Sequence, residues 1–130
     1  MYQGINYEAK EILLISDDNC FLNKNNDVEV ISSYPISITR NISIDDFLHN
    51  RKKPMYSQYH YIIIKDQYVD LVFPKINYYF AKKDFTLALI VDTKYKLENN
   101  YYINQLMNNS DYQTKFYDND DKLVIVFRRD

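Results

Sequence analysis

The sequence predicts an α+β fold, with a mostly antiparallel sheet of about five to seven strands and two helices packed on one face. Short apolar runs that end at polar turns indicate strands, and two segments have apolar residues at helical spacing instead. The elements follow the order strand, strand, helix, strand, strand and then strand, helix, strand, strand. With 130 residues and a hydrophobic share of 46%, we expect a single globular domain spanning residues 1–130.

The first three elements follow from local patterns. The apolar runs at 11–16 and 28–32 are interpreted as an antiparallel pair of strands joined by a long loop. Residues 43–53 are predicted to form a short helix, because Ser43 is a good N-cap and the acids after it suit the positive end of the helix dipole. The basic run at 51–53 suits the other end, and the proline that follows stops the helix.

The stretch SQYHYIIIKDQYVDLVF, residues 57–73, is predicted to be a β-hairpin with its turn at 65–67. Side chains alternate between the two faces of a strand, so one set of apolar side chains faces the core. That set is Ile62, Ile64, Val69, Leu71 and Phe73. The opposite face then gathers a second, amphipathic set, which we call the tyrosine face: Tyr59, Tyr61, Ile63, Tyr68, Asp70 and Val72. Its proposed binding residues are Tyr59, Tyr61, Tyr68 and Asp70.

The second half of the chain is assigned in the same way. Residues 85–93, FTLALIVDT, are apolar on both faces, as expected of a central strand. A helix is expected from about residue 97 to the polar run at 108–110. The chain then forms two strands around the acidic turn at 118–121.

The formal charge of −2 is unevenly distributed along the chain. Residues 40–96 carry ten bases and six acids, whereas both ends of the chain are acidic. Basic side chains interleaved with aromatic ones are typical of proteins that bind single-stranded nucleic acid. The basic residues that point to this alternative are Lys52, Lys53, Lys82 and Lys83.

The chain has only one glycine, Gly4, and this scarcity excludes several enzyme classes. Nucleotide-binding loops and the nucleophile turn of α/β-hydrolases need glycines where the backbone approaches a phosphate or takes positive φ. Cys20 is the only cysteine, so an intramolecular disulfide and a multi-cysteine zinc site are also excluded. We therefore predict no cofactor, no metal site and no catalytic residue.

Two arrangements of reactive side chains each have a simpler explanation. Cys20 has His49 or His60 as a potential base, but the two acids before it disfavour a thiolate. Asp45 and His49 are spaced i and i+4 on the predicted helix, which supplies two metal ligands. Two ligands are too few for a metal site, and helix capping already accounts for Asp45.

The small size, the absence of a catalytic motif and the tyrosine face predict a non-catalytic binding protein that contacts another protein. Inhibitors, immunity proteins and viral or phage accessory proteins are of this type. The excess of tyrosine is also what an AT-rich coding sequence produces, so it is weak support alone.

Two alternatives remain open. One is the single-stranded nucleic-acid-binding module described above. The other is a small nuclease-like enzyme with a dispersed site, drawing on Asp17, Asp18 or Asp70 with His60 and Lys65. A cytoplasmic protein without a membrane segment is expected, because no signal peptide or long apolar run is found, and self-association is left open.

Overall fold

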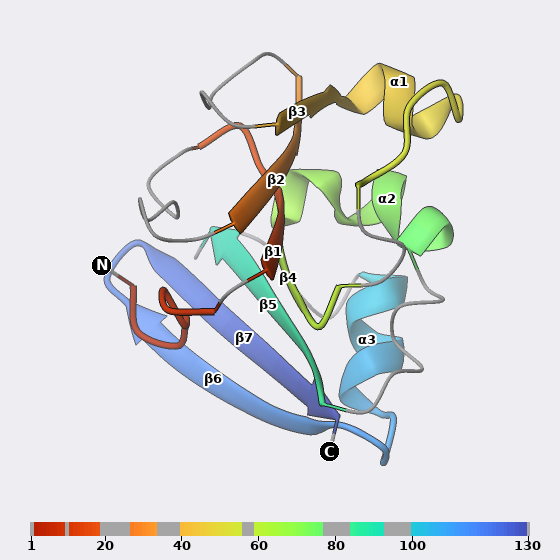
Figure 1. The fold of residues 1–130 in the computed structure, drawn as a ribbon. Helices are drawn as coiled ribbons and strands as arrows, with labels where there is room; N and C mark the ends of the chain where they lie inside the picture. The colour runs from red at the N-terminus through yellow and green to blue at the C-terminus, as the bar shows by residue number, and fades with distance from the viewer. Residues whose placement is uncertain are drawn as a thin grey trace.

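The computed structural model describes residues 2–9, 11–18, 27–33, 40–55, 59–76, 84–92 and 100–129. In these residues seven strands form one sheet, accompanied by three α-helices and one short 3-10 helix (Figure 1). In chain order the elements are β1 (Glu11–Ile15), β2 (Asp27–Ser32), β3 (Arg40–Ser43), α1 (Ile44–Leu48), β4 (Tyr61–Lys65), η1 (Asp66–Tyr68), α2 (Val69–Ile76), β5 (Phe85–Asp92), α3 (Tyr101–Met107), β6 (Gln113–Asn119) and β7 (Lys122–Arg129).

The sheet has the strand order β3-β2-β1-β4-β5-β7-β6. The pairings of β3 with β2, β2 with β1, β1 with β4 and β4 with β5 are parallel. β7 pairs antiparallel with both of its neighbours, β5 and β6. The prediction of a mostly antiparallel sheet is therefore wrong, and the strands at 11–15 and 27–32 are parallel neighbours.

The reason for this error lies in the composition of the strands. Residues 12–15 and 62–64 are fully buried, so β1 and β4 present apolar side chains to both faces. Strands that are buried on both faces are characteristic of parallel sheets, because the crossover connections cover them. The continuous runs EILLI and YIIIK carry this signal more clearly than any alternation between apolar and polar residues.

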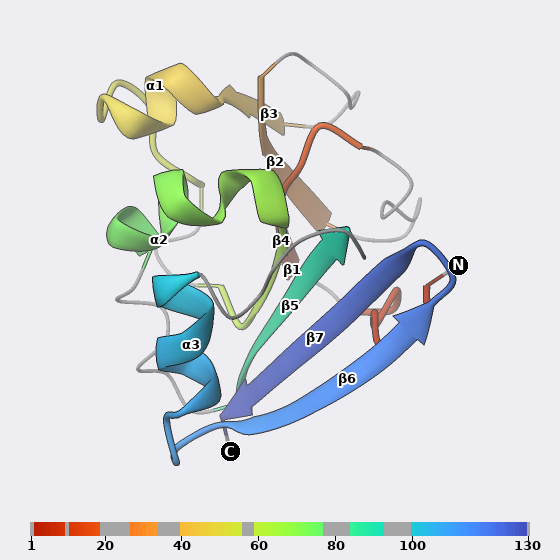
Figure 2. The ribbon, with the colours of Figure 1, turned by 180° about the vertical axis from the view of Figure 1, so that it is seen from behind.

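The two faces of the sheet are covered by different parts of the chain (Figures 1 and 2). Helices α1, α2 and α3 all pack on one face, which we call the helix-covered face, and they contribute Phe47, Val72 and Ile103 to its core. The other face, called the open face, carries a smaller apolar cluster. Among the described residues, the N-terminal segment 2–9 is the part of the chain outside the sheet that packs on the open face, with Ile5 buried there.

The predicted hairpin at 57–73 does not form. Strand β4 is followed directly by η1 and then by α2, so residues 66–76 are helical where a turn and a second strand were expected. The buried residues of α2 have helical spacing, at i, i+3, i+4 and i+7: Val69, Val72, Phe73 and Ile76. Leu71, which was placed in the core, is 51% exposed.

Several local predictions are confirmed. The Ser43 side chain caps α1, with its Oγ accepting a hydrogen bond from the backbone N–H of Asp46 at 3.0 Å. Strand β5 is buried on both faces, between β4 and β7. Strands β6 and β7 form the C-terminal antiparallel hairpin. No helix in the described parts of the chain is long and apolar enough to cross a membrane.

Candidate functional site

The parallel strands of this sheet define one edge where ligands bind in related architectures. β1 and β4 are neighbours, and the chain proceeds from β1 outward to β2 and β3 but from β4 outward to β5. The strand order thus reverses between β1 and β4. Open α/β sheets bind ligands outside the carboxyl ends of their strands at such a reversal. The residues that follow β1, β2 and β4 are therefore the first candidates for a functional site.

Asp17, which follows β1, is the centre of a hydrogen-bond network at this edge. Its Oδ1 accepts from the backbone N–H of Ser33, after β2, at 2.7 Å. Its Oδ2 accepts from the Tyr68 hydroxyl at 2.6 Å and from Gln67 Nε2 at 3.2 Å. The Ser33 hydroxyl lies 2.5 Å from the Tyr68 hydroxyl. One carboxylate therefore joins the ends of three parallel strands.

The environment of Tyr68 keeps its phenol protonated. The side chain is buried, at 4% exposure. Burial raises the pKa of the Tyr68 phenol, and its hydrogen bond to the Asp17 carboxylate raises it further. The phenol consequently remains a hydrogen-bond donor to Asp17 across the physiological pH range.

A second cluster of polar side chains lies at the ends of β4 and β5, beside the Asp17 network. Asp66 Oδ2 accepts from the backbone N–H of Asp92 at 3.1 Å, and Lys65 Nζ lies 3.7 Å from Asp66 Oδ1. Lys122 Nζ lies 3.6 Å from Asp92 Oδ2. Burial lowers the pKa of Lys65, although Asp66 opposes this shift.

The chemistry of this edge follows from its groups. Carboxylates are hydrogen-bond acceptors, and Asp17, Asp66 and Asp92 all lie here. Such a set suits a ligand that carries hydroxyl or ammonium donors. It disfavours a phosphate, which would meet like charges.

The three tyrosines of the predicted tyrosine face are separated and buried. Tyr59 is fully buried and its hydroxyl donates to Glu29 Oε1 at 2.5 Å. The Tyr61 hydroxyl accepts from the backbone N–H of Asn6 at 2.9 Å on the open face. Tyr59 and Tyr68 belong to the core of the helix-covered face instead. The tyrosine face therefore does not exist, because the hairpin that would have created it does not form.

The other predicted binding residues are dispersed. Asp70 is exposed on α2, where its Oδ1 accepts from Asn100 Nδ2 at 3.0 Å. Lys53 is exposed in the loop after α1. Lys82 and Lys83 lie outside the described residues.

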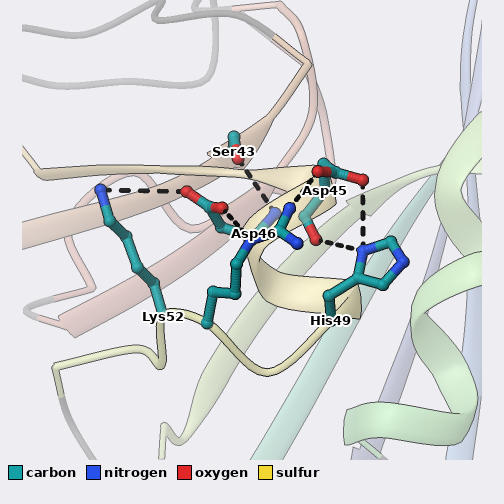
Figure 3. Close-up of polar contacts among 6 residues, drawn as sticks. Ser43, Asp45, Asp46, His49 and Lys52 are labelled. Carbon is teal, nitrogen blue, oxygen red and sulfur yellow. Dashed lines mark hydrogen bonds and ion pairs between the residues drawn. The ribbon is translucent and has the colours of Figure 1, made fainter.

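The charged side chains around α1 form hydrogen bonds and ion pairs with one another (Figure 3). Arg51 Nε donates to Asp46 Oδ1 at 2.7 Å, and the same guanidinium pairs with Asp45. This hydrogen bond lowers the pKa of Asp46. His49 Nδ1 lies 3.2 Å from Asp45 Oδ1, and Lys52 Nζ lies 3.9 Å from Asp46 Oδ2. In the part of the chain that the structure describes, no group of three or more His, Cys, Asp or Glu residues could hold a metal ion.

The residues of the nuclease-like alternative do not come together. Asp17 and Lys65 lie at the carboxyl ends of β1 and β4, whereas His60 directly precedes β4 at the other end of the sheet. Asp70 lies on α2. Cys20, the candidate nucleophile, lies outside the described residues.

Sequence reasoning missed Ser33 and Gln67, and it named Asp17 only as one acid of the nuclease alternative. A usable signal was present, since each of these polar residues closely follows an apolar run. That signal points to one edge only if the runs are known to be parallel.

Comparisons with known proteins identify the fold. No protein-family model matches the chain, and no curated protein matches it. The chain is similar to the solved structure of an rRNA methylase from Streptococcus thermophilus, at 12% sequence identity and a TM-score of 0.57, covering 92% of this chain and 87% of that one. A protein from Corynebacterium glutamicum was also found, at 13% identity and a TM-score of 0.48, covering 91% of this chain and 71% of that one.

The prediction of a non-catalytic binding protein of the inhibitor, immunity or viral accessory type is therefore wrong. Its structural basis, the tyrosine face, is absent, and the fold is instead one that occurs in an rRNA methylase. The chain has a mostly parallel, seven-stranded mixed sheet, and it shares this fold with that solved structure.

Proposed function

We propose that this chain is a small enzyme that transfers a methyl group to RNA, with an adenosyl methyl donor bound at the carboxyl edge of the sheet. The observation that carries the proposal is the Asp17 network at the point where the strand order reverses. The likeness to an rRNA methylase supports RNA as the acceptor.

The residues at this edge fit an adenosyl methyl donor better than a phosphorylated cofactor. S-adenosylmethionine carries a positive sulfonium group, an ammonium group and ribose hydroxyls. Carboxylates such as Asp17 and Asp66 accept hydrogen bonds from hydroxyl and ammonium groups and attract the positive charge. Residues 16–18, which directly follow β1, include no glycine, so side chains rather than a close backbone approach would hold the donor.

When bound, the donor supplies an electrophilic methyl group. The role of the chain itself is to bind and orient the donor. The Tyr68 hydroxyl and the Ser33 backbone N–H each bond one oxygen of Asp17, which fixes the plane of the carboxylate. Lys65 lies at the same edge, where burial lowers the pKa of its ammonium group and the neighbouring Asp66 opposes that shift.

Donor binding tests the proposal, measured by isothermal titration calorimetry with S-adenosylmethionine. We expect the Asp17→Asn variant to bind about tenfold more weakly, because one charged acceptor is lost. Asp18→Asn is the matched control, since Asp18 is the exposed neighbour of Asp17. Circular dichroism would establish that both variants remain folded.

Methyl transfer is measured separately, with radiolabelled donor and RNA, DNA or protein as the acceptor. Label that enters RNA, and is lost in the Asp17→Asn variant, supports the proposal. Absence of donor binding at millimolar concentration, or equal weakening by Asp18→Asn, would reject the site. Label that enters only protein would reject RNA as the acceptor.

A further inference from the structure

A hollow of about 680 Å³ lies at the opposite ends of the same strands. The N-terminal segment, the amino ends of β4 and β5, and the open face of β6 and β7 form its lining. Strand β5 has 8 residues and rises roughly 3.3 Å for each, so its two ends are about 25 Å apart. The hollow is therefore separate from the Asp17 network.

The shape of the hollow follows from the residues around it. Thr86 and Val126, both of moderate size, line it from adjacent strands. Gly4 closes one wall with a φ of 92°, a conformation that side chains other than glycine rarely adopt. A Cβ at this position would lie 2.6 Å from the ring of Tyr117. The glycine thus allows the N-terminal segment to approach the sheet closely and leaves the space beside it open.

Two cations and two carboxylates line the hollow. Arg128 of β7 lies opposite Gln113, and Lys115 follows two residues later along β6. The two cations are therefore diagonal neighbours on one face, with their backbone positions about 7–8 Å apart and their Cβ atoms somewhat closer. Glu11 and Asp84 line the hollow from the amino ends of β1 and β5. Among the described residues, no ion pair involves Lys115, Glu11 or Asp84.

We propose that this hollow binds a phosphorylated nucleoside, either as a free mononucleotide or as the terminal nucleotide of an RNA strand. Phosphate oxygens accept charge-assisted hydrogen bonds from the guanidinium of Arg128 and the ammonium of Lys115. The carboxylates of Glu11 and Asp84 accept from the amino group of a base, as acidic side chains do with cytosine. The volume lies within the range of small-molecule sites.

This inference goes beyond the proposed function, because it uses other residues at the other end of the strands. A chain that binds no methyl donor can still bind a nucleotide here. The two proposals therefore fail independently.

Backbone NMR spectra of the ¹⁵N-labelled full chain test the inference. Three probes are compared: adenosine 5′-monophosphate, adenosine, and a short RNA with a 5′-phosphate. We expect the signals of Thr86, Gln113 and Val126 to shift with the first or the third probe, and not with adenosine. Binding of the mononucleotide would show that a free nucleotide can occupy the hollow. Binding of the RNA but not of the mononucleotide would show that the ligand is the end of an RNA strand. Either result supports the inference.

Two neighbouring arginines provide a matched pair of variants. Arg128→Ala should weaken binding about tenfold, because a charged contact to phosphate is lost. Arg129→Ala should leave binding unchanged, since Arg129 is the next residue of the strand and pairs with Asp111 instead. Adenosine binding as tightly as its monophosphate would overturn the inference. So would equal weakening by Arg129→Ala, or shifts confined to the Asp17 network.

Discussion

The helix-covered face and the open face of the sheet differ in what lies over them. On the helix-covered face, α1, α2 and α3 bury a continuous apolar cluster that includes Phe85 and Phe127. On the open face, the described residues provide only segment 2–9 as cover, and the cluster beneath it is smaller. The hollow lined by Arg128 lies on that thinly covered side. Stability is therefore expected to come mainly from one face, while the other leaves space for a ligand.

The largest effect expected from this difference is seen with two adjacent residues of β7. Phe127 is fully buried on the helix-covered face, so Phe127→Ala should lower the free energy of unfolding by about 3–5 kcal/mol. Val126 is half-buried on the open face, so Val126→Ala should lower it by about 1 kcal/mol. Urea denaturation measures both values. Equal losses would show that the two faces contribute alike.

The next effect concerns pH and the open face. Burial raises the pKa of Tyr61 to about 12, from an ordinary value of 10.0. The folded state therefore holds the phenol proton more tightly than the unfolded state. The resulting stability is fully present below pH 10 and is lost as the pH rises toward 12, by about 3 kcal/mol in total.

Denaturation at a series of alkaline pH values, for the wild type and Tyr61→Phe, checks this expectation. The variant should lose less stability between pH 10 and 12, because the titrating phenol is gone. Tyr101→Phe serves as the control, since Tyr101 is 66% exposed. Identical pH profiles for the wild type and Tyr61→Phe would contradict the burial of Tyr61.

The smallest effect is expected at the N-terminal segment. Gly4→Ala places a side chain in left-handed backbone and against the Tyr117 ring, which should cost about 1–2 kcal/mol. Amide hydrogen exchange should increase in residues 2–9 while α2 and α3 remain protected. Loss of protection in the helices as well would mean that the segment is essential to the whole fold.

Local features of the fold could be predicted because they depend on neighbours in the sequence. The cap at Ser43, the central strand β5 and the C-terminal hairpin each follow from residues within a few positions of one another. The missed helix α2 also had a local signal, in the spacing of Val69, Val72, Phe73 and Ile76. The same residues also fit the alternation expected of a strand, and this is why the helix was not predicted.

The sequence by itself determined that strands and helices alternate with polar turns, and that no glycine-rich loop is available for a phosphate. Only the tertiary structure decided that β1, β2 and β4 run parallel, and this brings Asp17 into contact with Tyr68, 51 residues away. The physical reason is that side-chain periodicity reports how a strand is buried and not which strand lies beside it. Both sites proposed for this protein depend on those neighbours, because each gathers side chains from the ends of several strands.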